Sequence, residues 1–265
     1  MSLPLPTRKD ESWRYSDVEA LASVWPIGGP ERIAVAAGES VTRVIVQDAV
    51  ADAVVVRHYA LDLAAGASAT VYVLNAGGRF GRIAIDVTLH QGAHFELAGV
   101  ILGKADQTLE IVTTVTHAEP EATSNQVVRS ILGGRATGSY LGKVAVARDA
   151  QKTDAAQSVK AMLLDRTATA NAKPELEIYA DDVKCAHGAT VGELDAQALF
   201  YLASRGLPPA DAKRLLLEAF VASVFEGMDE GEERERIETA LAAALGGMLL
   251  APLPLAGGAG GGPVS

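Results

Sequence analysis

The residues best suited to chemistry in this sequence are Cys185 and His187, which stand one residue apart in the stretch EIYADDVKCAHGATVGELD. Cys185 is the only cysteine of the chain. If the stretch is a β-strand, the two side chains project to the same face and lie roughly 6 to 7 Å apart. A thiolate and an imidazole are both ligands of zinc and iron, so the pair is a candidate for two ligands of a metal site.

Two ligands do not complete a metal centre. A zinc ion normally takes four, and an iron–sulfur cluster is usually held by four thiolates, occasionally with histidines in their place. Any tight centre therefore needs ligands from outside this chain. The alternatives are an inert thiol beside a core histidine, or a nucleophile with its base, although neighbours two residues apart on a strand are poorly placed for the direct hydrogen bond that a base needs.

The other histidines and the known enzyme motifs add no second candidate. His58, His90, His94 and His117 have no such neighbour, and we interpret them as ordinary surface or hydrogen-bonded residues. The sequence contains no G-x-S-x-G motif, no Walker loop and no G-x-G-x-x-G motif.

The composition is that of a globular protein with an acidic surface. The chain has 265 residues, 49% of them hydrophobic, and a net charge of -10. It has no apolar run of about 18 residues that could span a bilayer, and its charge disfavours binding to a phosphate backbone. Its first residues lack the features of a secretory signal, and a single cysteine cannot form an intrachain disulfide. We therefore expect a cytoplasmic protein that binds neither nucleic acid nor membrane.

Short strands dominate the sequence between residues 31 and 193. In RIAIDVTL every second residue is aliphatic, which is the pattern of a half-buried strand. An aliphatic residue followed three positions later by Gly, Ala or Asp recurs every 26 to 32 residues, starting at Val35, Leu63, Leu89, Val115, Val146 and Ile178. This period favours the coils of a parallel β-helix. The alternative is a β-sandwich, which would favour hairpin dipeptides such as Asn-Gly.

The pattern changes to helices after residue 193. The first helix has Asp195 as its N-cap, the second begins at Pro208 and Pro209 and ends at Gly227, and the third has Asp229 as a possible cap. The predicted organisation is therefore an N-terminal segment (1–30), a β-helix core (31–193), a helical domain (194–247) and a disordered Pro- and Gly-rich tail (248–265).

Two stretches closely resemble the SufD type of the SufB/SufD family, the scaffold subunits of SUF iron–sulfur cluster assembly. They are LPTRKDESWRYSDVEAL, from Leu5 to Leu21, and KPELEIYADDVKCAHGATVGELDAQALFYLASRGL, from Lys173 to Leu207. The resemblance implies a mainly β fold, with a right-handed parallel β-helix core and a C-terminal α-helical domain. It also implies a non-enzymatic scaffold that pairs with SufB through the β-helix ends and docks a SufC ATPase on its C-terminal helices.

The resemblance also implies a role for the candidate pair. The histidine that matches His187 holds the nascent cluster together with a SufB cysteine, and Cys185 matches a nearby family cysteine for which iron binding and interface packing are both open. The cluster is then shared and transient, and none is expected on the isolated chain. ATP hydrolysis is expected only in SufC. Without SufB, the exposed solenoid ends make a homodimer plausible.

Two further expectations concern partner contacts. Leu216, Phe220, Val224 and Phe225 are spaced as an apolar stripe on the second helix, which predicts SufC docking or packing within the domain. Longer family members carry an extra helical segment around the opening motif, so we expect a shortened N-terminal region. The motif either contacts a partner or pins the terminus through Arg8, Lys9, Trp13, Arg14 and Tyr15.

Two other functions stay open as alternatives. One is a purely structural partner of SufB, in which Cys185 and His187 touch no metal. The other is a carbohydrate-active enzyme on a β-helix, which would need sugar-binding aromatic platforms and catalytic carboxylates, whereas aromatic residues make up 5% of the chain.

Overall fold

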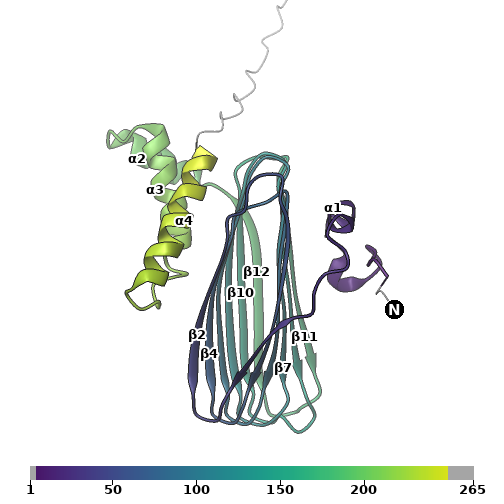
Figure 1. Cartoon of the computed structure of the whole chain (residues 1–265). Helices are drawn as coiled ribbons and strands as arrows, with labels where there is room; N and C mark the ends of the chain where they lie inside the picture. Colours follow the sequence, from purple (N-terminus) through teal and green to yellow (C-terminus); the bar gives the residue numbers. More distant parts are fainter. Residues whose placement is uncertain (1–3, 250–265) are drawn as a thin grey trace, which may run out of the picture.

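The structure is a computed structural model that describes residues 4–249 of the chain. Its body is a stack of coils, and each coil contributes one strand to each of two parallel sheets (Figure 1). The odd-numbered strands form one six-stranded sheet and the even-numbered strands form the other. The predicted parallel β-helix is confirmed. Residues beyond Leu249, where most of the predicted disordered tail falls, lie outside the described range.

The first sheet, called sheet A below, contains β1 (Glu31–Val35), β3 (Val54–Leu63), β5 (Phe80–Leu89), β7 (Thr108–His117), β9 (Thr137–Val146) and β11 (Thr169–Ile178). Sheet B contains β2 (Ser40–Gln47), β4 (Ser68–Asn75), β6 (His94–Gly103), β8 (Thr123–Leu132), β10 (Asp154–Leu163) and β12 (Lys184–Glu193).

Alternating side chains build the core between the two sheets. On β5, Ile83, Ile85 and Val87 are buried inside the solenoid, whereas the residues between them face outward. At the turn after β1, β3 and β5, Gly38, Gly66 and Gly92 adopt the left-handed conformation, with φ of 73°, 66° and 64°. The N–H of each donates to a carbonyl of the next coil, so these turns stack as regularly as the strands do.

One predicted repeat position is wrong by two residues. Leu89 pairs with His117, and His117 pairs with Val146, so His117 and not Val115 occupies the recurring aliphatic position. The prediction failed because it looked for an aliphatic residue at a position where this coil buries a histidine.

α2 (Ala196–Ser204) packs beside α3 (Pro209–Ala222) and away from sheet B. α3 and α4 (Glu232–Leu249) lie over the outer face of that sheet (Figure 1). Their contact with the sheet is apolar and joins the outward side chains of sheet B to Leu217, Val221, Ile237 and Leu245. Asp195 caps α2 as predicted, and Pro208 and Pro209 begin α3 as predicted. No described helix is long and apolar enough to cross a membrane.

Two predicted helix ends are wrong. The second helix stops at Ala222 and not at Gly227, because the following residues turn inward to pack against the sheet. α4 begins at Glu232, so Asp229 lies in the connection before it and does not cap the helix.

The opening motif lies on the opposite side of the solenoid, against sheet A (Figure 1). It forms a short 3-10 turn, η1 (Glu11–Trp13), and a short helix, α1 (Val18–Ala22). The Trp13 ring stacks on Arg82 at 3.9 Å, and Arg82 makes a buried ion pair with Glu110 at 2.6 Å. Ser16 donates a hydrogen bond to the same carboxylate at 2.9 Å. Trp13 and Ser16 therefore pin the terminus to the body.

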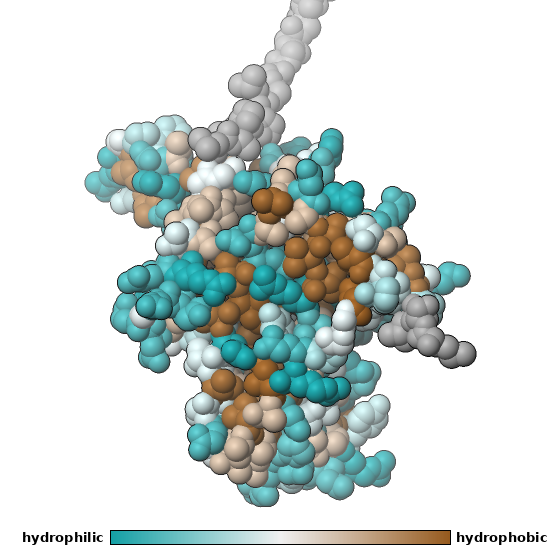
Figure 2. All heavy atoms as spheres, viewed as in Figure 1, coloured by the Kyte–Doolittle hydropathy of each residue, from teal (hydrophilic) through white to brown (hydrophobic). Residues whose placement is uncertain are grey.

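The rest of the motif is differently placed. Arg8, Lys9 and Arg14 are exposed, and Tyr15 is half-buried. Figure 2 shows apolar surface gathered between the helical domain and this N-terminal segment, on the face seen in Figure 1.

Candidate functional site

Cys185 and His187 lie on β12, the last strand of sheet B. Cys185 pairs with Ala155 of β10, and His187 pairs with Gln157. Ala155 and Gln157 are both buried inside the solenoid, so Cys185 and His187 project from the inner face of the final coil. The two side chains therefore share one face at the end of the stack.

The environments of the two side chains differ. Cys185 is half-buried and packs against the solenoid core. Burial raises the pKa of its thiol, and the nearby carboxylate of Asp154 raises it further, against a smaller lowering by a hydrogen bond from the Ala155 backbone. His187 is exposed. Among residues 4–249, no group of three or more His, Cys, Asp or Glu side chains could hold a metal ion, so the pair offers an incomplete ligand set.

No described strand stacks on the final coil, so its outer edge is uncovered. β12 pairs with β10 on one side and with no described strand on the other, which leaves a row of backbone N–H and C=O groups along its edge. Ile178 ends β11 and is 39% exposed, Tyr179 follows it and is 66% exposed, and Val191 of β12 is 50% exposed. We call Cys185, His187, Val191, Ile178 and Tyr179 the end surface.

Sequence reasoning missed the apolar members of the end surface. Val191 stands four residues after His187 on the same strand, so it belongs to the same inward-facing set. The signal for exposure was absent because the sequence alone does not say which coil is the last.

The four residues of the predicted docking stripe are not equally accessible. Leu216 and Phe220 are half-buried on α3. Val224 and Phe225 lie beyond the helix end and are only 5% and 3% exposed. Phe225 packs edge to face against Tyr72 of sheet B, with ring centroids 6.2 Å apart. Val224 and Phe225 therefore hold the helical domain to the solenoid in this structure.

The most exposed apolar helix is α2. It buries none of its residues, and Phe200 and Tyr201 are 77% and 57% exposed. On the neighbouring α3, Leu215 is 46% exposed. Sequence reasoning overlooked this surface, although the run ALFYLA has apolar residues on every face of a helix and could have signalled it.

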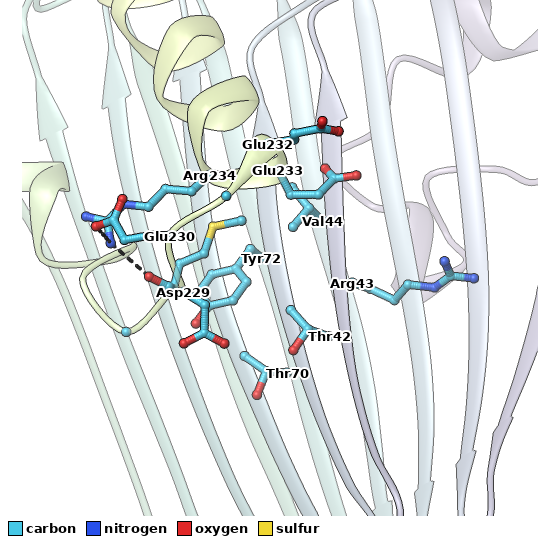
Figure 3. A pocket seen from close by; sticks show the side chains of 13 residues that line it. Thr42, Arg43, Val44, Thr70, Tyr72, Asp229, Glu230, Glu232, Glu233 and Arg234 are labelled. Atoms are coloured by element: carbon cyan, nitrogen blue, oxygen red, sulfur yellow. Dashed lines mark hydrogen bonds and ion pairs between the residues drawn. The ribbon is translucent and has the colours of Figure 1, made fainter.

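A groove of about 680 Å³ lies between β2, β4 and the connection from α3 to α4 (Figure 3). Asp229 and Glu230 extend along it near Tyr72, and burial followed by the negative charge of Asp229 raises the pKa of that phenol. Arg234 pairs with Glu230 at 3.0 Å and donates a hydrogen bond to the Met228 carbonyl at 2.8 Å. These contacts fix the connection over the sheet, and the groove is the seam between helical domain and solenoid.

Known proteins resemble this chain over the solenoid and the first helices. Residues 31–220 match the sequence model of the domain described as SUF system FeS cluster assembly, SufBD core domain. The match covers the whole β-helix and α2, and it ends within α3. The chain belongs to the SufBD core family.

Individual members of the SufBD family agree with this assignment. The chain is 39% identical to the iron–sulfur cluster assembly protein SufD of Escherichia coli over 124 residues, which are 46% of this chain and 29% of that protein. It is 35% identical over 156 residues to a SufBD family protein of Synechocystis, slr0076, covering 58% of this chain and 34% of the relative. It is also 35% identical over 167 residues to the chloroplastic protein ABCI7 of Arabidopsis thaliana, covering 62% and 35%.

The matched stretches span about a third of the length of these relatives. The SufBD family assignment, the β-helix and the C-terminal helices agree with a SufD-type iron–sulfur cluster assembly protein, as the two quoted motifs predicted.

Proposed function

We propose that this chain is a non-enzymatic scaffold subunit of SUF iron–sulfur cluster assembly, and that its end surface pairs with a SufB-type subunit. In that pairing, Cys185 and His187 supply ligands to a nascent cluster shared between the two chains. The observation that carries the proposal is that both side chains project from the inner face of the last strand of sheet B, whose outer edge pairs with no described strand.

The chemistry of the pair requires a second subunit. A cluster usually takes four protein ligands, and histidine can replace thiolate on an iron. The described part of this chain offers two neighbouring candidates and no third. The open backbone edge of β12 and the exposed Val191 and Tyr179 offer hydrogen bonds and apolar area to a partner strand at the same place. Pairing there would complete the ligand set and also shield the cluster from water.

The helical domain is the proposed site for a SufC-type ATPase. α2 exposes Phe200 and Tyr201 and buries none of its residues, and large aromatic side chains are frequent anchors of protein interfaces. Leu215 extends this surface onto α3. It stands next to the half-buried Leu216, which the sequence analysis predicted as part of the docking stripe. The ATPase would supply ATP hydrolysis, since this chain contains no Walker motif.

The test is a co-purification of this chain with SufB-type and SufC-type partners under anaerobic conditions. Iron and acid-labile sulfide are measured in the parent complex and in complexes that carry His187→Ala, Cys185→Ser or His94→Ala. His94 is the matched control, because it is a partly exposed histidine of the same sheet, paired with Glu96 at 3.2 Å.

The proposal expects His187→Ala to assemble normally and to lose most of the iron and sulfide, with the control unchanged. Equal cluster content in the parent and His187→Ala complexes would remove His187 from the site. The chain would then be a structural partner whose Cys185 and His187 only shape the interface.

A further inference from the structure

One column of inward-facing side chains changes from apolar to polar toward the end surface. One inward-facing column of sheet B runs through Val71, Leu97, Gln126, Gln157 and His187, each paired in register with the next. The first two are aliphatic, whereas Gln126 and Gln157 are polar and almost fully buried. Burying an amide costs free energy unless it is hydrogen-bonded, so these glutamines need a reason to be there.

A hydrogen-bond network holds the two glutamines of this column, Gln126 and Gln157, in place. The Gln126 side-chain carbonyl accepts from the Thr113 hydroxyl at 2.7 Å and from the Tyr140 hydroxyl at 3.0 Å. Gln157 Nε2 donates to the Tyr140 hydroxyl at 3.2 Å. Burial raises the pKa of Tyr140, so its hydroxyl keeps its proton.

This network dictates how the Gln157 amide is oriented. A phenol has a single proton to donate, and Tyr140 gives it to Gln126. The phenol oxygen also contacts the Thr113 hydroxyl at 3.1 Å, and the Gln157 amide beside it is turned so that its NH₂ donates to the phenol. The Gln157 carbonyl oxygen is left buried, and it has no hydrogen-bond partner among the described residues.

His187 is the in-register neighbour of Gln157 on the next strand and stands on the same inward face. Neighbouring strands lie about 4.8 Å apart, which is within reach for an amide and an imidazole that stack in one column. The exposed ring can rotate toward Gln157, and an N–H of imidazole is the donor that the orphaned carbonyl lacks.

We propose that Gln157 is the positioning residue of His187: its side-chain carbonyl accepts one ring N–H and leaves the other ring nitrogen free to bind iron. This rests on the proposed function of His187 as a cluster ligand. Histidines that ligate metals almost always donate their second ring N–H to an acceptor, which fixes the tautomer and the ring orientation. Tyr140, Gln126 and Thr113 then serve to hold that acceptor in place.

The test measures the tautomer directly. The full chain is labelled with ¹⁵N-histidine, and the ring nitrogens of His187 are observed by NMR at pH 8, assigned by their loss in His187→Ala. The parent should show one protonated and one unprotonated nitrogen. Gln157→Leu should give averaged signals from two tautomers, and Gln157→Glu, which keeps an acceptor, should restore the single tautomer.

The matched control is Gln47→Leu, the same substitution at another buried glutamine of sheet B, which donates to Asn75 on β4 and lies outside the Gln126–Tyr140–Gln157 network, far from β12. It should leave the His187 signals as in the parent, although it also removes a buried side-chain hydrogen bond. In the partner complex, Gln157→Leu should weaken cluster retention by about 10-fold or more, and Gln157→Glu should recover it.

The outcomes separate the two proposals. A single His187 tautomer in Gln157→Leu would overturn the positioning role, even if His187→Ala loses the cluster. A single tautomer in the parent that disappears in Gln157→Leu, together with full cluster content in His187→Ala, would support the hydrogen bond and refute the ligand role. Averaged signals in both Gln157→Leu and Gln47→Leu would mean that loss of any buried glutamine acts on His187 through folding, which also overturns the proposal.

Discussion

The buried histidine of the solenoid predicts a stability that depends on pH. His117 occupies the inward position that Leu89 and Val146 take in the adjacent coils, and its side chain is fully buried. Its Nε2 forms a hydrogen bond with the Ser124 hydroxyl at 2.9 Å. Burial lowers the pKa of His117 from 6.5 to about 4. The ring is therefore neutral inside the fold and protonated more easily once the chain unfolds.

The sign and size of the effect follow from this pKa difference. Between pH 6.5 and pH 4 the unfolded chain binds a proton at this residue that the folded chain does not, so stability falls as the pH falls. Acidification through both pKa values lowers the free energy of unfolding by about 3 kcal/mol in total, and about 2 kcal/mol of this decrease has occurred by pH 5.

The assay is urea unfolding at pH 7.5 and at pH 5, for the parent and for the double variant His117→Leu with Ser124→Ala. The variant continues the aliphatic column and leaves no unpaired hydroxyl. The parent should lose about 2 kcal/mol more than the variant on acidification. His90→Ala is a control for which the pH dependence has the opposite sign. The hydrogen bond to Glu119, and to a smaller extent the one to Asp62, raises the pKa of His90, so its stabilising contribution is lost as the pH rises. Equal losses in the parent and the double variant would refute a neutral, buried His117.

Three further predictions concern the N-terminal motif and the two proposed interfaces. Glu110→Ala leaves Arg82 buried without its partner and should lower the free energy of unfolding by about 3–5 kcal/mol, measured by urea titration. Val191→Lys places a charge on the end surface and should abolish pairing with a SufB-type chain in size-exclusion chromatography, with unfolding changed by no more than about 0.5 kcal/mol. Phe200→Ala combined with Tyr201→Ala should weaken binding of a SufC-type ATPase by about 10-fold or more in calorimetry.

Each of these has a control elsewhere on the chain. Asp86→Ala removes an exposed carboxylate that pairs with His58 and should cost less than about 1 kcal/mol, so a similar cost for Glu110→Ala would contradict the burial argument. Val50 is 79% exposed and lies after β2, in the first coils. If Val50→Lys blocks pairing as strongly as Val191→Lys, or Val50→Ala weakens ATPase binding as strongly as the aromatic pair, the proposed surfaces are misplaced.

The sequence was sufficient to predict the fold because local patterns determine it. Alternation in RIAIDVTL predicted which residues face the core, and the stacked glycines after β1, β3 and β5 carried the coil period. The predicted repeat position was wrong in one coil, because the sequence alone does not identify His117 as a core residue; its pairing with Leu89 does. The predicted end of the second helix was wrong because Val224 and Phe225 pack against sheet B and do not continue the helix.

The candidate site was predictable only in part. The spacing of Cys185 and His187 predicted a shared strand face, which is what β12 provides. Its place at an open end, and the in-register Gln157 beneath His187, follow from the order of strands and from long-range pairing. No local pattern reports that information, since Gln157 is separated from His187 by a whole coil.

The most direct test of the account is to ask whether a histidine nitrogen of this chain binds the cluster. Only this subunit is labelled with ¹⁵N-histidine, the complex with SufB-type and SufC-type partners is isolated anaerobically and reduced, and the cluster is examined by pulsed electron paramagnetic resonance. The account predicts a ¹⁵N hyperfine coupling of a directly bound nitrogen, absent from the His187→Ala complex. A cluster that shows no coupling to labelled nitrogen, or the same coupling after His187→Ala, would contradict the account.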